Sequence, residues 1–261
     1  MEVLYGVHPV EEAIRSGARR LELVSVARER KDARLEGVIR LAKSKGVRVA
    51  LESREQLTRL ARTDAHQGVL ALVRAREFLG VEDLMAVEKA EGEYRFILAL
   101  DGVEDPQNLG ALIRTADGAG VDGVILPERR SAPVTATVAK ASAGASEHVR
   151  IARVTNLVRS LELLKEKNVW VLGLDERGTP DYVDFDFRTD CVLVLGREGA
   201  GLHDLVKKTC DHLLRIPMAG MVSSLNVGVA GAVVMYEAMR QRRKAPELVT
   251  KKVKERKGLG S

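Results

Sequence analysis

IPMAGMVSSLNVGVAGAVVMYE, residues 216 to 237, joins a loop without periodicity to a helix that has no charged face. Pro217 lacks a backbone donor and the residues after it have no period, so the sequence predicts an ordered loop here. Over 225–239 apolar residues recur at helical spacing, while the opposite side carries Gly228 and Gly231. Because a helical glycine costs about 1 kcal/mol relative to alanine, this pair indicates close approach by another backbone or by a second subunit. We therefore expect a helix that is buried on all sides.

The polar residues at the start of this helix have two interpretations. Ser223 and Ser224 are candidate N-caps, and Asn226 lies in the first turn beside an apolar surface. Taken alone, the segment is typical of a capped core helix. The other interpretation is a ligand site at the start of the helix.

The composition is that of an ordinary globular protein, with 45% apolar and 30% charged residues in a chain of 261. This length indicates two domains, since single cores commonly stop growing near about 250 residues. No apolar run approaches the roughly 18 residues of a membrane span, and the first residues lack a signal-peptide pattern. We expect a cytoplasmic protein with no membrane partner. Cys191 and Cys210 are not at metal-ligand spacing, so we expect structural thiols and no metal.

Charge is distributed unevenly along the chain. Residues 1–75 have a net charge of +5, residues 76–240 of −6 and residues 241–261 of +6. A polyanion is therefore expected to bind at the flanks rather than on the central body. Aromatic residues make up only 3% of the chain, which disfavours recognition of bases by a broad stacking platform.

Residues 1–75 have the pattern of a small α/β domain. The loop DAHQG at 64–68 is expected to be a turn, with a ligand contact as the alternative. Residues 76–93 are strongly charged and are predicted to be a linker with at most one short helix at 81–90. In the first domain we expect helices at 8–15, at 32–44 and from a Ser53 cap to Ala61, and strands at 21–26, 47–51 and 69–73.

From Arg95 onward strands alternate with helices, which is typical of a mostly parallel sheet covered on both faces. Ligands of such sheets bind beyond the carboxyl ends of the strands, here the loops 101–107, 173–180, 196–201 and 217–224. We assign residues 94–243 to this second domain and residues 244–261 to a basic tail. The expected strands are 96–100, 123–126, 148–151, 169–174, 191–195 and 213–216, and the expected helices before the last one are 109–119, 134–142, 157–167 and 202–209.

Two glycine-rich segments match nucleotide-binding motifs in part. GAGVDG at 118–123 matches G-x-G-x-x-G but ends a helix and enters a strand, the reverse of the dinucleotide context. A nicotinamide-dependent oxidoreductase would rest on this segment alone. GREGAG at 196–201 does follow a strand, yet it places Glu198 where a phosphate would bind, which disfavours a P-loop.

The helix predicted at 109–119 has Asn108 as a plausible N-cap and Gly120 as a plausible C-cap. Arg114 lies about 140° around the helix from Leu109, so it leaves the core-facing stripe. It is either a solvated arginine or a guanidinium aimed into a cleft, where its planar fork can hold a phosphate with two hydrogen bonds.

Three segments now point to one family. DPQNLGALIRTADGAGV, VLVLGREGAGL and the opening stretch, in this order and spacing, resemble the three motifs of the SpoU branch of the SPOUT RNA methyltransferases over residues 95–240. YGVHPVEEAI and DAHQGV resemble the small substrate-binding domain, similar to ribosomal protein L30e, that precedes the catalytic domain in members acting on large-subunit ribosomal RNA.

The resemblance implies methyl transfer from S-adenosylmethionine to a ribose 2′-hydroxyl of RNA, with a guanosine of 23S ribosomal RNA as the expected target. It also implies a parallel-sheet domain with a deep trefoil knot, and a homodimer whose interface includes the last helix. Neither the knot nor the dimer follows from composition or spacing. The implied catalytic residues are Asn108, Arg114, Glu198, Ser224 and Asn226, and the implied cofactor-binding residues are Leu172, Gly173, Gly196, Ile216, Met218 and Leu225.

Arg114 has been proposed as the base in this family, but an arginine with a pKa above about 12 is a poor base. We favour phosphate clamping and charge stabilisation, and leave the acceptor of the proton open. Asn108 and Glu198 are expected to orient Arg114 or the cofactor loop. Ser224 and Asn226 are expected to hold the ribose or to cap the last helix.

Two alternatives to this function remain at this stage. Transfer RNA enzymes share the three motifs, and only the first domain favours ribosomal RNA over transfer RNA. A non-catalytic RNA-binding factor for ribosome assembly, with a vestigial methyl-donor pocket, is the other alternative, and the complete set of polar residues argues against it.

Overall fold

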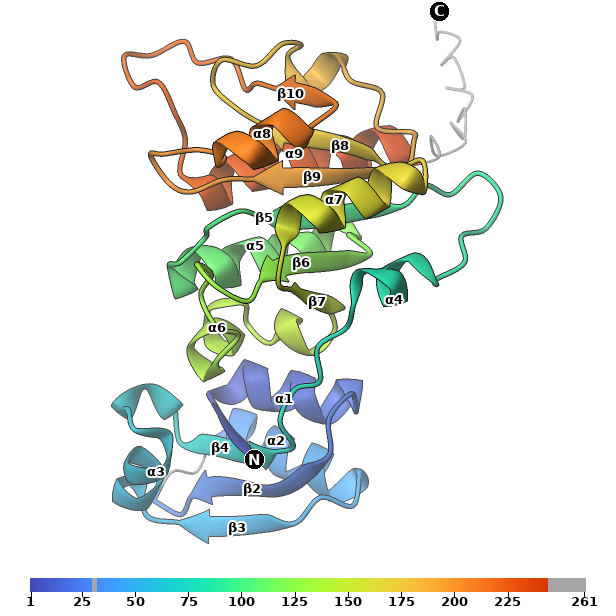
Figure 1. The fold of residues 1–261 in the computed structure, drawn as a ribbon. Helices are drawn as coiled ribbons and strands as arrows, with labels where there is room; N and C mark the ends of the chain where they lie inside the picture. The colour runs from blue at the N-terminus through green and yellow to red at the C-terminus, as the bar shows by residue number, and fades with distance from the viewer. Residues whose placement is uncertain (30–31, 244–261) are drawn as a thin grey trace, which may run out of the picture.

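The computed structural model describes residues 1–29 and 32–243, so the predicted tail at 244–261 lies outside the described residues. A four-stranded sheet forms the first domain and a six-stranded sheet the second. Figure 1 shows the two sheets at opposite ends of an elongated molecule, joined by the chain that leads to α4 (Val81–Met85).

The first domain has the strand order β1-β4-β2-β3, in which only β2 and β3 are parallel. Ser53 accepts a hydrogen bond from the backbone N–H of Gln56, which confirms it as the cap of the third helix. The sequence reading placed no strand before the first helix, yet residues 2–5 pair with the end of the domain as β1. The elements are β1 (Glu2–Tyr5), α1 (Val7–Ser16), β2 (Leu21–Ala27), α2 (Ala33–Ser44), β3 (Val49–Glu52), α3 (Arg54–Ala61), η1 (Asp64–His66) and β4 (Val69–Val73).

The loop at 64–68 is an internally bonded turn. His66 is buried, accepts from the backbone N–H of Gly68 at Nδ1 and lies 3.1 Å from the Thr58 hydroxyl at Nε2. Burial, together with the charge of Arg54, lowers the pKa of His66 below its ordinary value. The imidazole is therefore neutral at pH 7, and Nε2 donates to Thr58. This geometry supports the turn over the ligand contact.

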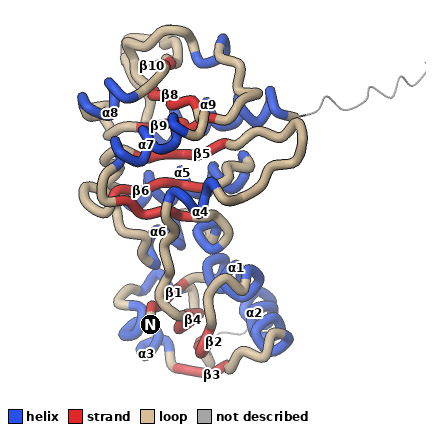
Figure 2. The backbone as a smooth tube through the Cα atoms, turned by 45° about the vertical axis from the view of Figure 1, so that its right-hand side comes forward, coloured by secondary structure: helices blue, strands red, loops and turns tan. Residues whose placement is uncertain are grey.

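All strands of the second sheet are parallel, which agrees with the predicted mostly parallel sheet. Their order is β10-β8-β9-β5-β6-β7. Helices lie on both of its faces (Figure 2). The strands are β5 (Phe96–Leu100), β6 (Gly123–Pro127), β7 (Ile151–Val154), β8 (Trp170–Leu174), β9 (Cys191–Leu195) and β10 (His212–Leu214). The other elements are α5 (Pro106–Ala119), α6 (Ala136–Ala141), η2 (Ala145–Glu147), α7 (Leu157–Glu166), η3 (Tyr182–Asp184), α8 (Asp204–Thr209) and α9 (Val227–Arg242).

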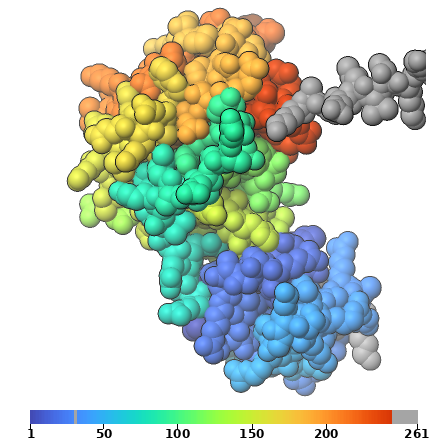
Figure 3. All heavy atoms as spheres, turned by 90° about the vertical axis from the view of Figure 1, so that its right-hand side faces the viewer, coloured from blue at the N-terminus to red at the C-terminus, as the bar shows by residue number. Residues whose placement is uncertain are grey.

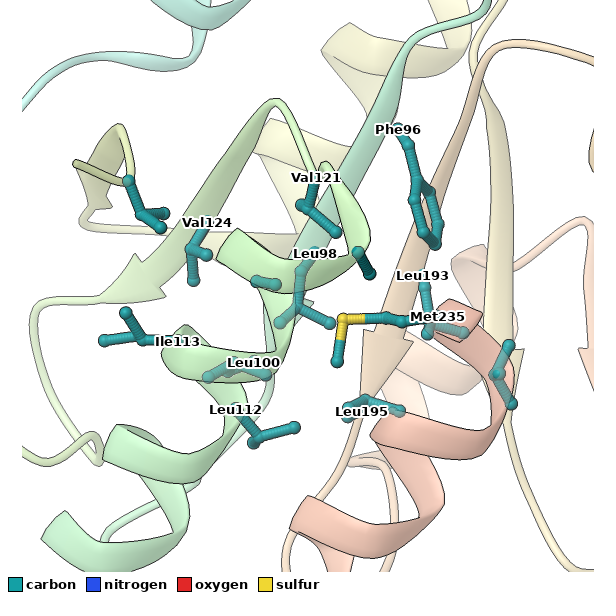
Figure 4. Close-up of a cluster of buried hydrophobic side chains, with 14 of the residues drawn as sticks. Phe96, Leu98, Leu100, Leu112, Ile113, Val121, Val124, Leu193, Leu195 and Met235 are labelled. Atoms are coloured by element: carbon teal, nitrogen blue, oxygen red, sulfur yellow. The ribbon is translucent and has the colours of Figure 1, made fainter. Parts of the chain in front are cut away.

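Side chains alternate between two cores, one on each face of this sheet. Leu98 and Leu100 point into the core formed with α5 and α9, whereas Ile97 and Ala99 point into the core formed with α4 and α7. Figure 4 shows Met235 reaching from α9 toward the sheet residues of the first core. The continuously apolar strands are thus explained by burial on both faces.

Gly231 allows α9 to approach both α5 and the sheet. A Cβ at this position would lie 2.6 Å from Leu112 Cδ2 and 2.7 Å from Leu195 Cδ1. These nearest atoms belong to side chains, so the packing at Gly231 is close, but the predicted approach of another backbone or of a second subunit stays a prediction. The prediction that α9 is buried on all sides is wrong for a single chain, because Val229 and Tyr236 are each 51% exposed.

The segment predicted to be a linker contributes to the second core. The backbone N–H of Leu79 donates to Ile151 O at 3.0 Å, and Arg153 N–H donates back to Leu79 O at 3.0 Å. Val81 and Leu84 on α4 are buried against the sheet. Because residues 76–93 are strongly charged, the sequence offered little indication that these few apolar side chains are buried. The domain boundary itself stays a prediction.

Within residues 1–29 and 32–243, no helix has both the length and the apolar character that crossing a membrane requires.

Strand β7 begins at Ile151 and not at His148 as predicted, because η2 extends to Glu147.

Two glycine-to-alanine substitutions are expected to have opposite effects on stability. A Cβ on Gly110 of α5 would lie 2.3 Å from Ala141 Cβ and 3.0 Å from backbone atoms of α6, so Gly110→Ala should lower the free energy of unfolding by about 1–3 kcal/mol. Gly37 in α2 has nothing within 4 Å of such a Cβ, so Gly37→Ala should raise it by about 0.5–1 kcal/mol. Urea unfolding followed by circular dichroism measures both. A Gly110→Ala protein as stable as its parent would contradict the observed α5–α6 packing.

Candidate active site

A cavity of about 380 Å³ lies beyond the carboxyl ends of β8, β9 and β10. Three segments form its wall: the residues after β8, the loop 196–201 after β9, and the loop between β10 and α9. These are three of the four loops that the parallel sheet predicted as binding positions. The lining residues are Leu174, Asp175, Glu176, Arg177, Leu195, Gly196, Arg197, Glu198, Gly199, Ala200, Gly201, Leu202, Asp204, Lys207, Ile216, Met218, Ser223, Ser224, Leu225, Val227 and Ala230.

A network of three side chains joins the wall of this cavity to two helices. Glu198 accepts a hydrogen bond from Asn108 Nδ2 at Oε2 (3.0 Å) and another from Asn226 Nδ2 at Oε1 (3.1 Å). Asn226 Nδ2 also donates to Asn108 Oδ1 at 3.0 Å. Both oxygens of the carboxylate and both amides are thus engaged. The structure therefore brings together three of the five residues predicted as catalytic.

Asn108 reaches this network because it does not cap its helix. The N-cap of α5 is Asp105, whose side chain accepts from Asn108 N–H at 2.9 Å, and Pro106 opens the first turn. The predicted cap at Asn108 was wrong, since Asp105 followed by proline is the stronger start signal. Gly120 ends the helix in the left-handed conformation, with φ of 72°, as predicted.

Asn226 caps α9, so the predicted caps at Ser223 and Ser224 were wrong. Its Oδ1 accepts from the backbone N–H groups of Gly228 (2.9 Å) and Val229 (3.3 Å). The amide nitrogen of the same side chain remains free to donate to Glu198. A serine hydroxyl, with a single donor and a shorter reach, could not serve both partners. Ser224 lies in the cavity wall instead.

Arg114 is exposed on α5 and is not part of the cavity wall. It lies six residues beyond Asn108, about 9 Å farther along the helix axis. Within the described part of the chain, its guanidinium has no hydrogen bond or ion pair. The structure thus places Arg114 on the exposed surface of α5, apart from the network.

Four of the six predicted cofactor-binding residues lie in the cavity wall: Gly196, Ile216, Met218 and Leu225. Gly196 permits close contact between backbones, because a Cβ there would lie 2.2 Å from the carbonyl carbon of Gly201. Leu172 and Gly173 are buried within β8, below the cavity, and the lining begins one residue later, at Leu174.

Sequence reasoning missed an ion pair in the cavity wall. Lys207 Nζ on α8 donates to Asp175 Oδ2 at 2.7 Å, and the backbone N–H of Arg177 donates to Asp175 Oδ1 at 2.9 Å. Burial opposes the ionisation of Asp175, but the hydrogen bonds from Lys207 and Arg177 outweigh it and hold its pKa below the ordinary value. The position of Asp175 directly after an apolar strand was the signal that could have found it.

A second missed pair lies behind the loop 196–201. Asp101 at the end of β5 accepts from His203 at both oxygens, from the backbone N–H at 2.7 Å and from Nδ1 at 2.8 Å. These bonds fix the start of α8 to the end of β5. Among residues 1–29 and 32–243 there is no group of three or more side chains that could hold a metal ion, and metal independence stays a prediction.

Comparison with known proteins agrees with these motifs. Residues 95–236 match the model of the SpoU rRNA Methylase family, and residues 3–79 match a model described as RNA 2′-O ribose methyltransferase substrate binding. The chain is 42% identical to a putative TrmH family tRNA/rRNA methyltransferase, YacO, of Bacillus subtilis, over 92% of this chain and 96% of the relative. It is 43% identical to the 23S rRNA (guanosine-2′-O-)-methyltransferase RlmB of Vibrio cholerae, over 92% and 97%.

Among solved structures, the SpoU methyltransferase AviRb from Streptomyces viridochromogenes, in complex with its cofactor AdoMet, superposes with a TM-score of 0.76 at 26% identity. The superposition covers 92% of this chain and 90% of AviRb, which includes both domains. The match of the family model to more than half of the chain, and of full-length relatives above 40% identity, places this protein in the SpoU rRNA methylase family.

Proposed function

We propose that this protein transfers a methyl group from S-adenosylmethionine to the ribose 2′-hydroxyl of a guanosine in 23S ribosomal RNA. The observation that carries the proposal is the Asn108–Glu198–Asn226 network beside a cavity at the carboxyl edge of the sheet. It unites the polar residues of all three motifs, which lie far apart in the sequence. A vestigial methyl-donor pocket would not require these three polar residues to meet beside it.

The cavity fits S-adenosylmethionine in size and chemistry. About 380 Å³ lies within the range of small-molecule sites. Leu195, Ile216, Leu225, Val227 and Ala230 offer an apolar surface for an adenine ring. The narrow turn at Gly196 presents backbone groups, and carboxylates in the wall suit hydroxyl groups and a cation. We assign cofactor contacts to Gly196, Ile216, Met218 and Leu225, and move the contacts predicted at Leu172 and Gly173 to Leu174 and Asp175.

S-adenosylmethionine would supply a methyl group already activated on a sulfonium. The residues of the chain then have to align the 2′-oxygen with that methyl and to stabilise the charge that changes during transfer. Glu198 and the two asparagines fix the loop 196–201 against α5 and α9. Ser224, in the cavity wall, is placed to hold the ribose.

Arg114 is assigned to the RNA phosphate. Its exposed guanidinium has no partner among the described residues, so both faces of its fork remain open to a phosphate. An arginine side chain stays protonated in proteins, so Arg114 is not assigned as the proton acceptor. The proton of the 2′-hydroxyl is not assigned to any residue.

Arg114→Ala is expected to lower kcat for RNA methylation on the order of 10²-fold, because a charge-stabilising donor is lost. Binding of S-adenosylmethionine and the melting temperature should change little, since Arg114 is exposed and unpaired. Transfer of tritiated methyl groups to RNA measures kcat, and calorimetry measures cofactor binding. Arg159→Ala, which removes an equally exposed arginine from α7 on the other face of the sheet, is the control and should retain full activity. Near-full turnover by Arg114→Ala would exclude the assigned role.

Ribosomal RNA is favoured over transfer RNA by the first domain. That domain matches the substrate-binding family model and has a net charge of +5, against −6 for the residues 76–240 that contain the cavity. We assign recognition of the RNA to residues 1–75 and cofactor binding to the second domain.

Removal of the first domain should separate these two activities. Because Leu79, Val81 and Leu84 belong to the second core, the fragment has to begin at residue 76. Fragment 76–261 is expected to bind S-adenosylmethionine within a few-fold of the full chain, to lose most of its RNA affinity and to show a weaker salt dependence. Each lost phosphate contact lowers the slope of log affinity against log salt by about 0.9 or less.

Fragment 76–243 controls for the basic residues that follow. Filter binding over a series of salt concentrations measures RNA affinity. If 76–243 bound and methylated 23S ribosomal RNA as well as the full chain does, the first domain would not be the recognition module.

We further propose a homodimer, a deep trefoil knot in the second domain and a cytoplasmic location. The dimer is supported by the outer surface of α9, where Val229 and Tyr236 lie seven residues apart on one face and are each 51% exposed. Half-exposed apolar side chains on a helix whose other face is buried are typical of a subunit interface.

Val229→Glu should convert the dimer into monomers, because it places a charge in the apolar interface. Sedimentation equilibrium measures the molecular mass. Val183→Glu, in η3 and 49% exposed, is the matched control and should leave the mass unchanged. A dimer that persists in Val229→Glu would exclude this face of α9 as the interface.

A further inference from the structure

A buried ion cluster joins the two domains. Glu147, in η2 of the second domain, has a side chain that is 0% exposed. Arg19 of the first domain donates to both of its oxygens, from Nε at 2.9 Å and from Nη2 at 2.8 Å, and Arg76 Nη2 donates at 2.7 Å. Arg19 also bonds Glu2, at the start of β1. One carboxylate thus holds the turn after α1 and the chain that leaves β4.

The surface around Glu147 is closely packed. Ala139 of α6 belongs to the buried core cluster of the first domain. Gly144 has φ of 90°, and a Cβ on it would lie 2.8 Å from Glu12 Cβ. At the rim, Lys140 Nζ donates to Ala65 O at 2.7 Å. Figure 3 shows the first domain in direct contact with this part of the second domain.

The cluster specifies one orientation of the first domain. A buried carboxylate is tolerated only where cations and donors satisfy it, so any other docked orientation would leave Glu147 buried and unpaired. Burial lowers the pKa of Arg76, and the charge of Glu147 opposes that effect. The arginines therefore depend on the carboxylate as much as the carboxylate depends on them.

The segment that carries Glu147 also contacts the helix of the active site. On its other side, Ala141 lies so close to Gly110 that α5 has no room for a side chain there. Figure 1 shows α6 between α5 and the first domain. The first domain is thus fixed relative to α5, which begins beside Asn108 and carries Arg114. The superposition of AviRb over both domains is consistent with a defined arrangement.

We propose that Glu147 is a positioning residue, which fixes the RNA-binding domain on α6 and η2 so that bound RNA is presented to the active site. This inference rests on the proposed function. Without the cluster, the two domains would bind RNA as linked but independently oriented modules, and the effective concentration of the target ribose at the site would fall.

The test uses the full chain carrying Glu147→Gln, which keeps the size of the side chain and removes its charge. With 23S ribosomal RNA transcribed in vitro, the KM for RNA should rise by about tenfold or more, because the fixed geometry is lost. The kcat and the affinity for S-adenosylmethionine should stay within about twofold of the parent, since the cavity is unchanged. Small-angle X-ray scattering should show a larger radius of gyration.

Two further variants separate positioning from general damage. Glu12→Gln removes the exposed interdomain pair with His148, at 2.8 Å, and should leave the KM within about twofold. Arg76→Gln added to Glu147→Gln should raise the KM little further, because the cluster that both residues form is already broken. If Glu147→Gln does not fold, Arg19→Lys replaces it, since lysine keeps the charge but cannot make the paired contact.

An unchanged KM together with unchanged scattering in Glu147→Gln would overturn the proposal. An equal rise of the KM in Glu12→Gln would also overturn it, because any disturbance of the interface would then suffice. If the parent chain failed to methylate the RNA, the proposed function would fail, while the scattering comparison would still decide whether Glu147 fixes the domains.

Discussion

Glu198 accepts one hydrogen bond on each carboxylate oxygen, from the side chains of Asn108 and Asn226, and the active site depends on this arrangement. The two asparagines stand at the starts of α5 and α9, and Glu198 stands in the loop after β9. A single carboxylate therefore joins the loop after β9 to the starts of two helices at the carboxyl edge of the sheet. Since the backbone of 196–201 forms much of the cavity wall, the shape of the cavity follows from these bonds.

Close packing of small residues around α5 makes this arrangement possible. Gly231 brings α9 against Leu112 on one side, and Gly110 brings α6 against the helix on the other. A Cβ at either position would lie within 2.6 Å of a neighbouring side-chain atom, so a larger side chain would push the packed elements apart. The hydrogen bonds of the site therefore depend on the close packing of the core.

The division of charge matches the division of the chain into domains. The residues that contain the cavity have a net negative charge and the first domain has a net positive charge, so we expect RNA to bind mainly at the part of the molecule that lacks the cavity. Such a division requires that the two parts be held in a fixed relation. The interface supplies it through a buried carboxylate and two arginines, whose geometry admits one orientation.

Much of the fold could be predicted from the sequence, because periodicity and capping depend on neighbours within about four residues. The parallel α/β sheet, the strand at Val69–Val73, the Ser53 cap and the Gly120 cap all belong to this class. Of the candidate site, the three motifs predicted Asn108, Glu198 and Asn226, which the structure brings together, and the order of strands and helices predicted their loops at one edge of the sheet.

The remaining features were decided by the tertiary structure alone. Asp105 followed by proline is the stronger cap signal, but the partner of Asn108, Glu198, lies 90 residues away and only the fold brings it near. Strand β1 forms because β4 offers it an edge, the charged segment before β5 is anchored by a few apolar side chains, and Asp175 meets Lys207 through folding. Two partners of Glu147 are also distant in the sequence: Arg19 lies 128 residues away and Arg76 lies 71 residues away. Local rules cannot choose among such partners, because a buried charge or a close helix contact is satisfied by whichever residue the packing brings near.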